Sequence, residues 1–266
     1  MFVISRKIFM RIVTSRLLYL FIAIVAIGSC KSDDDANPED PRAENRRGLG
    51  TSAEELLSDD IYTSLTVEFV YSEGFRPQQQ TIDTFRPFLD RLLNKPGGIT
   101  FVETVIEQPD GKPYTTQEIR EIENENRTQY TDGDNIAVFV YFANGGASGD
   151  TNTSVTLGTA YQNTSIVIYQ ETLQNINGLP NGPDLFLLEA TTLRHEFGHI
   201  LGLVNILDDD IHTIHEDPDN NRHCVVEDCL MYFESTVPGT IAFPMKGDIP
   251  VLDPLCLADL EAKGGK

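Results

Sequence analysis

The stretch TTLRHEFGHILGLVN, residues 191–205, contains the pattern H-E-x-x-H in His195, Glu196 and His199. Apolar residues recur before Gly202 at helical spacing, and a glycine is a common helix end, so the stretch predicts a helix. Histidines four positions apart project from one helix face and can bind the same zinc ion. Glu196 lies beside the first histidine, where it can act as general base on a zinc-activated water.

A catalytic zinc needs a third protein ligand, and the sequence does not supply it directly after the helix. Asn205 stands three residues beyond Gly202, and its neutral amide is a poor zinc ligand. Farther on, the stretch RHCVVEDCLMYF, residues 222–233, contains the order H-C-x4-C-x-M from His223 to Met231. Together the two motifs resemble those of the archaemetzincins, a branch of the metzincin zinc metalloproteases.

The resemblance implies a role for each motif residue. His195, His199 and His223 would hold one catalytic Zn²⁺ ion. Glu196 would take a proton from the attacking water and return it to the leaving amine. Met231 would form the Met-turn, a tight turn that supports the metal from below. The implied activity is that of a zinc-dependent endopeptidase, which hydrolyses peptide bonds.

The chain departs from the family pattern in an insertion, residues 206–222, between the two motifs. His215 in this insertion is an alternative third zinc ligand, and His212 or a carboxylate is a further candidate. The interval from His223 to Met231 keeps the family spacing, and the third-ligand role is therefore assigned to His223.

Hydrophobic patterning predicts alternating strands and helices in the rest of the chain. Strands are expected at residues 61–71, 99–107, 136–142, 154–161 and 165–170, and helices at 81–94, 115–127, 183–202 and 252–262. This order indicates an α+β fold in which two to three helices pack on a twisted, mixed sheet of five strands. The resemblance implies a metzincin-like zincin with a small irregular C-terminal subdomain. It also makes residues 154–161 an edge strand that receives substrate.

The N-terminus has the features of an export signal. Basic residues and the apolar run 17–27 precede Cys30, which is typical of a secretory signal peptide. The site resembles a bacterial lipobox, so residues 1–29 are predicted to be removed and Cys30 to be lipidated. An uncleaved anchor helix is the alternative. Residues 30–60 are acidic and almost free of apolar side chains before Leu56, which predicts a flexible tether.

Charge and domain organisation complete the prediction. The formal net charge of -21 argues against nucleic acid and anionic membrane surfaces as partners. We expect a monomeric, extracytoplasmic lipoprotein that acts on peptides or proteins. Its lipid would anchor it to the outer membrane, where it would be exposed at the cell surface. Residues 61–266 would form the catalytic domain, with halves 61–202 and 203–266. A non-catalytic surface lipoprotein that keeps the fold as a binding module is the alternative, and a thermolysin-like zinc aminopeptidase is a weaker one.

Three cysteines, Cys224, Cys229 and Cys256, remain after Cys30 is set aside. Archaemetzincins hold a second, structural zinc with four cysteines, and this chain has one cysteine where that pattern ends in a pair. A four-cysteine site is therefore not available. One disulfide among the three is expected in an exported protein, and a structural zinc held by three cysteines and a histidine remains open.

Overall fold

The computed structural model describes residues 40, 42–232 and 248–266. The residues from 42 onward belong to one compact unit. The predicted signal peptide, the lipidated Cys30 and the first part of the predicted tether lie outside the described residues. No helix within these described ranges has both the length and the apolar character that a membrane span requires.

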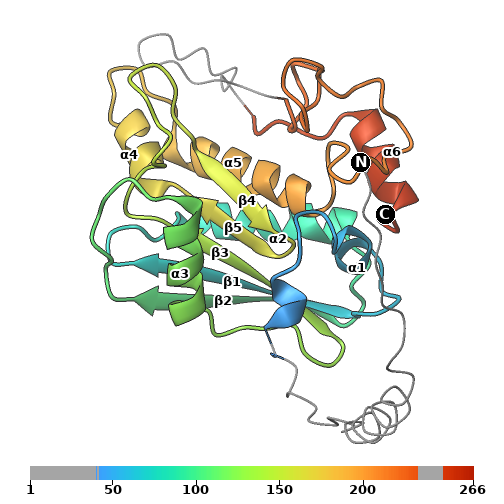
Figure 1. Cartoon of the computed structure of the whole chain (residues 1–266). Helices are drawn as coiled ribbons and strands as arrows, with labels where there is room; N and C mark the ends of the chain where they lie inside the picture. Colours follow the sequence, from blue (N-terminus) through green and yellow to red (C-terminus); the bar gives the residue numbers. More distant parts are fainter. Residues whose placement is uncertain (1–39, 41, 233–247) are drawn as a thin grey trace, which may run out of the picture. The chain divides into compact units, whose positions relative to one another are not determined.

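A single five-stranded sheet with the order β2-β1-β3-β5-β4 forms the centre of the fold (Figure 1). Its strands are β1 (Ser64–Ser72), β2 (Gly98–Ile106), β3 (Asn135–Phe142), β4 (Gly158–Gln162) and β5 (Ser165–Ile168). All neighbours pair in parallel except β4, which runs antiparallel to β5 at one edge. The predicted mixed sheet is confirmed, and so is the edge position of the strand expected at 154–161.

Strand β4 begins later than predicted because a polar loop captures the preceding backbone groups. The Asp150 carboxylate accepts hydrogen bonds from the N–H groups of Ala147, at 3.2 Å, and Thr156, at 2.8 Å. The Thr151 hydroxyl accepts one from the Ser154 N–H at 3.0 Å. Backbone donors engaged in this way cannot join a sheet ladder, so only the residues from Gly158 onward pair with β5.

Helices cover both faces of the sheet. On one face α2 (Gln79–Leu92), α4 (Gln170–Asn177) and α5 (Leu185–Ile200) contribute to the larger core cluster, and α3 (Thr116–Asn126) contributes to a smaller cluster on the other. The C-terminal helix α6 (Pro254–Ala262) also joins the larger cluster. Helix α4 is not predicted from the sequence, and the number of helices exceeds the two to three expected.

The predicted flexible tether is wrong for its described part, residues 42–60. This segment forms η1 (Ala43–Asn45) and α1 (Ala53–Leu57), and its apolar residues join the larger core cluster. The fully buried Asn45 amide donates to the carbonyl of Ala137 at 3.0 Å. Buried Lys95 donates to the carbonyls of Glu55, Ser58 and Tyr62. Asn45 thus satisfies a buried backbone carbonyl, and carbonyls of the segment accept from Lys95, which composition does not reveal.

Candidate metal centre

Helix α5 carries His195, Glu196 and His199 into a cleft beside the edge strand β4. Asp184 caps the start of this helix by accepting hydrogen bonds from backbone N–H groups, at 2.9 Å from Phe186 and 3.3 Å from Leu187. The helix contributes many buried apolar side chains to the core. Both imidazoles and the carboxylate are therefore displayed from a rigid, packed element.

The structure brings His223 to the two helix histidines. The ligand atoms of His195, His199 and His223 all lie within 4.8 Å of one another. Their ring centroids are 4.8 Å apart for His195 and His199, and 5.2 Å apart for each pair that includes His223. This is the arrangement that three imidazoles need in order to share one metal ion.

Backbone carbonyls orient all three imidazoles in the same way. The Nδ1 atom of His195 lies 2.8 Å from the Leu230 carbonyl, that of His199 lies 2.8 Å from the Leu203 carbonyl, and that of His223 lies 3.1 Å from the Asn221 carbonyl. A carbonyl can only accept, so each Nδ1 carries the proton and each Nε2 keeps its lone pair for a metal.

Burial keeps these imidazoles neutral, as metal ligands must be. It lowers the pKa of His195 to about 4, with the neighbouring His223 as a second cause, and it lowers the pKa of His199 well below its usual range. Burial also lowers the pKa of His223. The donor set therefore fits a zinc ion: three neutral nitrogens, oriented by their carbonyl partners and available together at neutral pH.

Glu196 faces the same cleft without joining the three histidines. Its carboxylate accepts a hydrogen bond of 2.8 Å from the Ala160 N–H of strand β4. Burial raises the pKa of Glu196 to about 8, and the hydrogen bond from Ala160 opposes part of that rise. A carboxylate tuned close to neutral pH suits a group that must take up a proton and release it again. Sequence reasoning did not identify the part played by Ala160.

A close packing contact joins helix α5 to the segment that follows the insertion. Met231 is fully buried, and a Cβ added at Gly198 would lie 2.4 Å from the Met231 sulfur. The residue before this methionine, Leu230, supplies the carbonyl that orients His195. Met231 thus packs against the helix that carries the site.

The insertion leaves helix α5 through a sharp turn. Gly202 and Asn205 both adopt left-handed backbone conformations, with φ angles of 91° and 52°. The Asn205 amide donates to Glu216 at 3.0 Å, and its backbone N–H donates to Asp210 at 2.6 Å. Helix α5 has already ended at Ile200, so Asn205 fixes the start of the insertion, and it is not one of the three clustered nitrogen ligands.

His215, the alternative third ligand, lies in a separate buried cluster. Its ligand atom groups with those of Cys224, Asp253 and Cys256, and not with those of the helix histidines. The three described cysteines after position 42 are free, so the expected disulfide is not formed. The placement favours His223 over His215 in the cleft, and it leaves His215 for another role.

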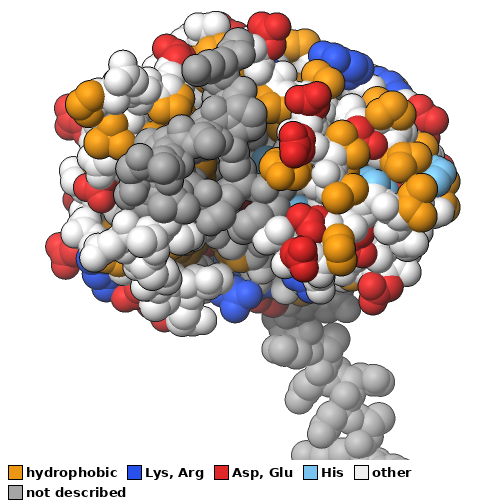
Figure 2. Space-filling view, turned by 90° about the horizontal axis from the view of Figure 1, so that it is seen from above, with side chains coloured by type: hydrophobic (Ala, Val, Ile, Leu, Met, Phe, Trp, Pro, Cys, Tyr) orange, Lys and Arg blue, Asp and Glu red, His pale blue; other side chains and the backbone are white. Residues whose placement is uncertain are grey.

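The cleft in front of the three histidines has a volume of about 430 Å³. One wall is the start of strand β4, and the others come from helix α5 and from the segment around His223. On the face viewed in Figure 2, acidic and hydrophobic side chains are mixed, and histidine surface shows among them. The cleft lies beside β4, which pairs with β5 alone among the strands of the described residues.

Comparison with known proteins gives limited information. No protein-family model matches the sequence, and no curated protein matches it. Among solved structures, the chain is similar to the archaemetzincin of Methanopyrus kandleri, with 16% sequence identity, a TM-score of 0.47 and coverage of 76% of this chain and 96% of that one. Because this similarity is low, the functional assignment rests on the geometry of the site.

Proposed function

We propose that this chain is a zinc-dependent endopeptidase. The observation that carries the proposal is the convergence of His195, His199 and His223, whose ligand atoms lie within 4.8 Å of one another next to the buried carboxylate of Glu196. Three neutral nitrogens with an adjacent general base are typical of a hydrolytic zinc site and exceed what a structural zinc requires.

Different groups of the protein bind the metal, transfer the proton and position the substrate in the proposed hydrolysis. His195, His199 and His223 would hold the zinc, which when bound supplies Lewis-acid polarisation of the peptide carbonyl and lowers the pKa of water. Glu196 takes a proton from the attacking water on its carboxylate and returns that proton to the leaving amine. The free edge of β4 holds the substrate backbone extended, and Ala160 keeps the Glu196 carboxylate in place before substrate arrives.

The experiment is cleavage of an unstructured protein such as casein by the purified chain. We expect cleavage that is lost in His199→Ala and removed from wild-type protein by a chelator, then restored by zinc. Zinc bound to the wild type without any cleavage would instead support the non-catalytic binding module.

We also propose that the enzyme is an extracytoplasmic lipoprotein. The apolar run 17–27 followed by Cys30, and the acidic segment after it, support this proposal. Metabolic labelling with a palmitate analogue tests it. We expect lipid on the wild type and none on Cys30→Ser, and equal labelling of both forms would contradict it.

A further inference from the structure

The N-terminal part of the described chain lies across the tip of the β4–β5 hairpin (Figure 1). The N–H group of Asn163, at this tip, donates to the carbonyl of Arg47 at 3.2 Å. The fully buried Asn163 side chain donates to the carbonyl of Glu44 and to the hydroxyl of Ser52, each at 2.7 Å. Residues 44–52, which we call the wall segment, are thus fastened across the end of the strand that borders the cleft.

Leu49 of the wall segment and Ile206 of the insertion form the surface at this end of the cleft. Both side chains line the cleft, and Ile206 is buried whereas Leu49 is half-buried. Gly50 allows the two segments to meet. It has a φ angle of 79°, and a Cβ added there would lie 2.7 Å from a methyl carbon of Ile206. The wall segment and the insertion are therefore in direct contact, and the surface that they present to the cleft is aliphatic.

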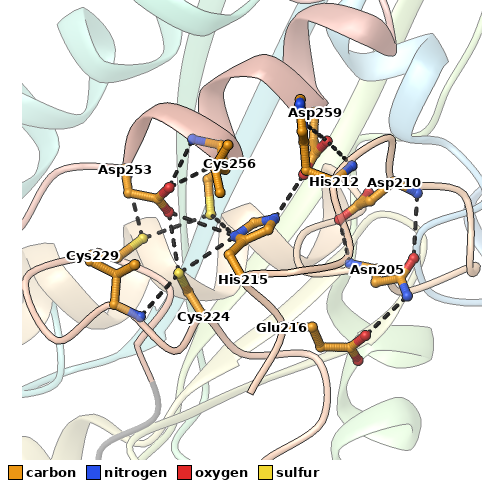
Figure 3. Close-up of polar contacts among 12 residues, drawn as sticks. Asn205, Asp210, His212, His215, Glu216, Cys224, Cys229, Asp253, Cys256 and Asp259 are labelled. Carbon is orange, nitrogen blue, oxygen red and sulfur yellow. Dashed lines mark hydrogen bonds and ion pairs between the residues drawn. The ribbon is translucent and has the colours of Figure 1, made fainter. Parts of the chain in front are cut away.

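Ile206 is held in place at the start of the insertion. The preceding residue, Asn205, donates from its side-chain amide to Glu216 at 3.0 Å and from its backbone to Asp210 at 2.6 Å (Figure 3). The N–H of Ile206 itself donates to the Gly202 carbonyl at 3.2 Å. The aliphatic surface is therefore formed before a substrate arrives, and a substrate does not have to order it.

The length of strand between the catalytic carboxylate and the wall segment determines how many substrate residues fit there. Glu196 accepts a hydrogen bond from the Ala160 N–H, and Asn163 stands three residues farther along the chain. A strand rises about 3.3 Å per residue, so the wall segment lies about 10 Å from the reacting bond. Antiparallel pairing is the more stable kind, so a substrate added to β4 would run toward the wall segment with its amino-terminal side. Its third residue before the scissile bond would reach Leu49 and Ile206.

The charge at this end of the cleft favours an internal residue of the substrate over its amino terminus. Arg222 is the only lysine or arginine among the described residues that line the cleft. Its carbonyl accepts a hydrogen bond of 3.3 Å from the N–H of Val204, two residues before Ile206. A positive side chain here repels a free amino group. The aliphatic surface therefore suits a side chain in the middle of a longer peptide.

We propose that Leu49 and Ile206 form a specificity subsite that selects an aliphatic side chain at the third residue before the scissile bond. This inference rests on the proposed function, because it assigns a substrate preference to the same cleft. Burial of one aliphatic side chain on such a surface should favour it over alanine by about tenfold in kcat/KM. Beyond this residue the wall segment turns the substrate away from β4, so more distant residues should have no such effect.

The test uses a casein-derived peptide that the zinc-loaded wild-type chain cleaves at one bond. Forms with leucine and with alanine at the third position before that bond are compared by kcat/KM. We expect wild type to favour the leucine form about tenfold, Leu49→Ala to reduce this ratio to about one, and Leu49→Met to keep it. Equal cleavage of the two forms by wild type would overturn the proposal. Loss of cleavage on acetylation of the peptide's amino terminus would also overturn it, because the end of the cleft would then bind an amine.

Two controls show whether the effect is specific to this end of the cleft. Leu257 is also a half-buried leucine that packs against the larger core cluster, and it is not among the described residues that line the cleft. Leu257→Ala should therefore keep the leucine preference, and an equal loss in both variants would contradict the assignment to Leu49. Leucine six residues before the bond should confer no preference, because that residue lies about 20 Å from the bond and beyond the wall segment.

Peptide binding separates this inference from the proposed peptidase activity. The zinc-loaded Glu196→Gln protein should bind a labelled leucine peptide about tenfold more tightly than the alanine form in fluorescence anisotropy, and Leu49→Ala in that background should remove the difference. Such a difference without cleavage by wild type would contradict the peptidase and support the subsite. Cleavage by wild type with equal binding of both forms would contradict the subsite alone.

Discussion

The contact between Gly198 and Met231 predicts that Gly198→Ala destabilises the wild-type protein but stabilises a variant in which the Met231 side chain has been removed. Alanine stabilises a helix interior by up to about 1 kcal/mol relative to glycine. In the wild type, the new Cβ would stand 2.4 Å from the sulfur and 3.1 Å from the methyl carbon of a fully buried Met231. Overpacking of this kind costs about 1–3 kcal/mol, so we expect Gly198→Ala to lower the free energy of unfolding by about 1–2 kcal/mol.

The same change in a Met231→Ala background should stabilise the protein. The truncated side chain leaves room for the new Cβ at position 198. The higher helix propensity of alanine should then raise the free energy of unfolding by about 0.5–1 kcal/mol. Met231→Ala alone should cost about 2–5 kcal/mol because it opens a cavity. The interaction energy between the two positions is therefore about 1.5–3 kcal/mol.

Urea unfolding followed by far-ultraviolet circular dichroism measures the four proteins of this cycle. All samples should be metal-free and at the same chelator concentration, because bound zinc would shift the midpoints by mass action. Equal effects of Gly198→Ala in both backgrounds would refute the reasoning, because they would mean that Met231 does not press against the helix.

Three further predictions follow from other contacts. Gly158→Ala should reduce peptidase activity with little change in zinc content, because its Cβ would lie 2.7 Å from the Glu196 side chain, whereas Gly149→Ala meets nothing within 4 Å and should leave activity unchanged. Lys95→Ala should lower the free energy of unfolding by about 2–4 kcal/mol in a denaturant titration, because three buried or partly buried carbonyls lose their donor, whereas Lys112→Ala, at an exposed ion pair, should leave it nearly unchanged. In the metal-free protein, the contribution of Glu196 to the unfolding free energy should fall as pH rises from about 4.5 to about 8, because burial raises the pKa of Glu196 to about 8 and the unfolded chain ionises first. The difference between wild type and Glu196→Gln in a pH series of urea titrations isolates this contribution, because the lowered pKa values of His195 and His199 act in the opposite direction in both proteins.

The sequence predicts the parts of the fold in which local pattern and tertiary role agree. The apolar run of β3 reads as a central strand and is one, and the helix that carries His195 has a cap and a clear end. Residues 42–60 show no such agreement. Their few apolar side chains and the buried Asn45 acquire their role only from partners far along the chain, such as Ala137. No local pattern in a polar segment reveals these partners.

The cysteines and histidines also show that local sequence patterns predict some site residues but not those brought together by long-range contacts. The local spacing from His223 to Met231 carries the family resemblance, and that resemblance implies that both residues lie near helix α5, where the structure has them. His215 meets Cys256 only because the insertion folds against helix α6, and sequence spacing does not contain that contact. An odd set of cysteines beside unassigned histidines was the available signal.

The most direct test of the central claim is a comparison of wild type and Glu196→Gln for casein cleavage and zinc content in the same preparations. The change keeps the size of the side chain and removes its ability to take up a proton. We predict unchanged zinc content and a loss of cleavage of about 10²- to 10⁴-fold. Cleavage at the wild-type rate by Glu196→Gln would contradict the account.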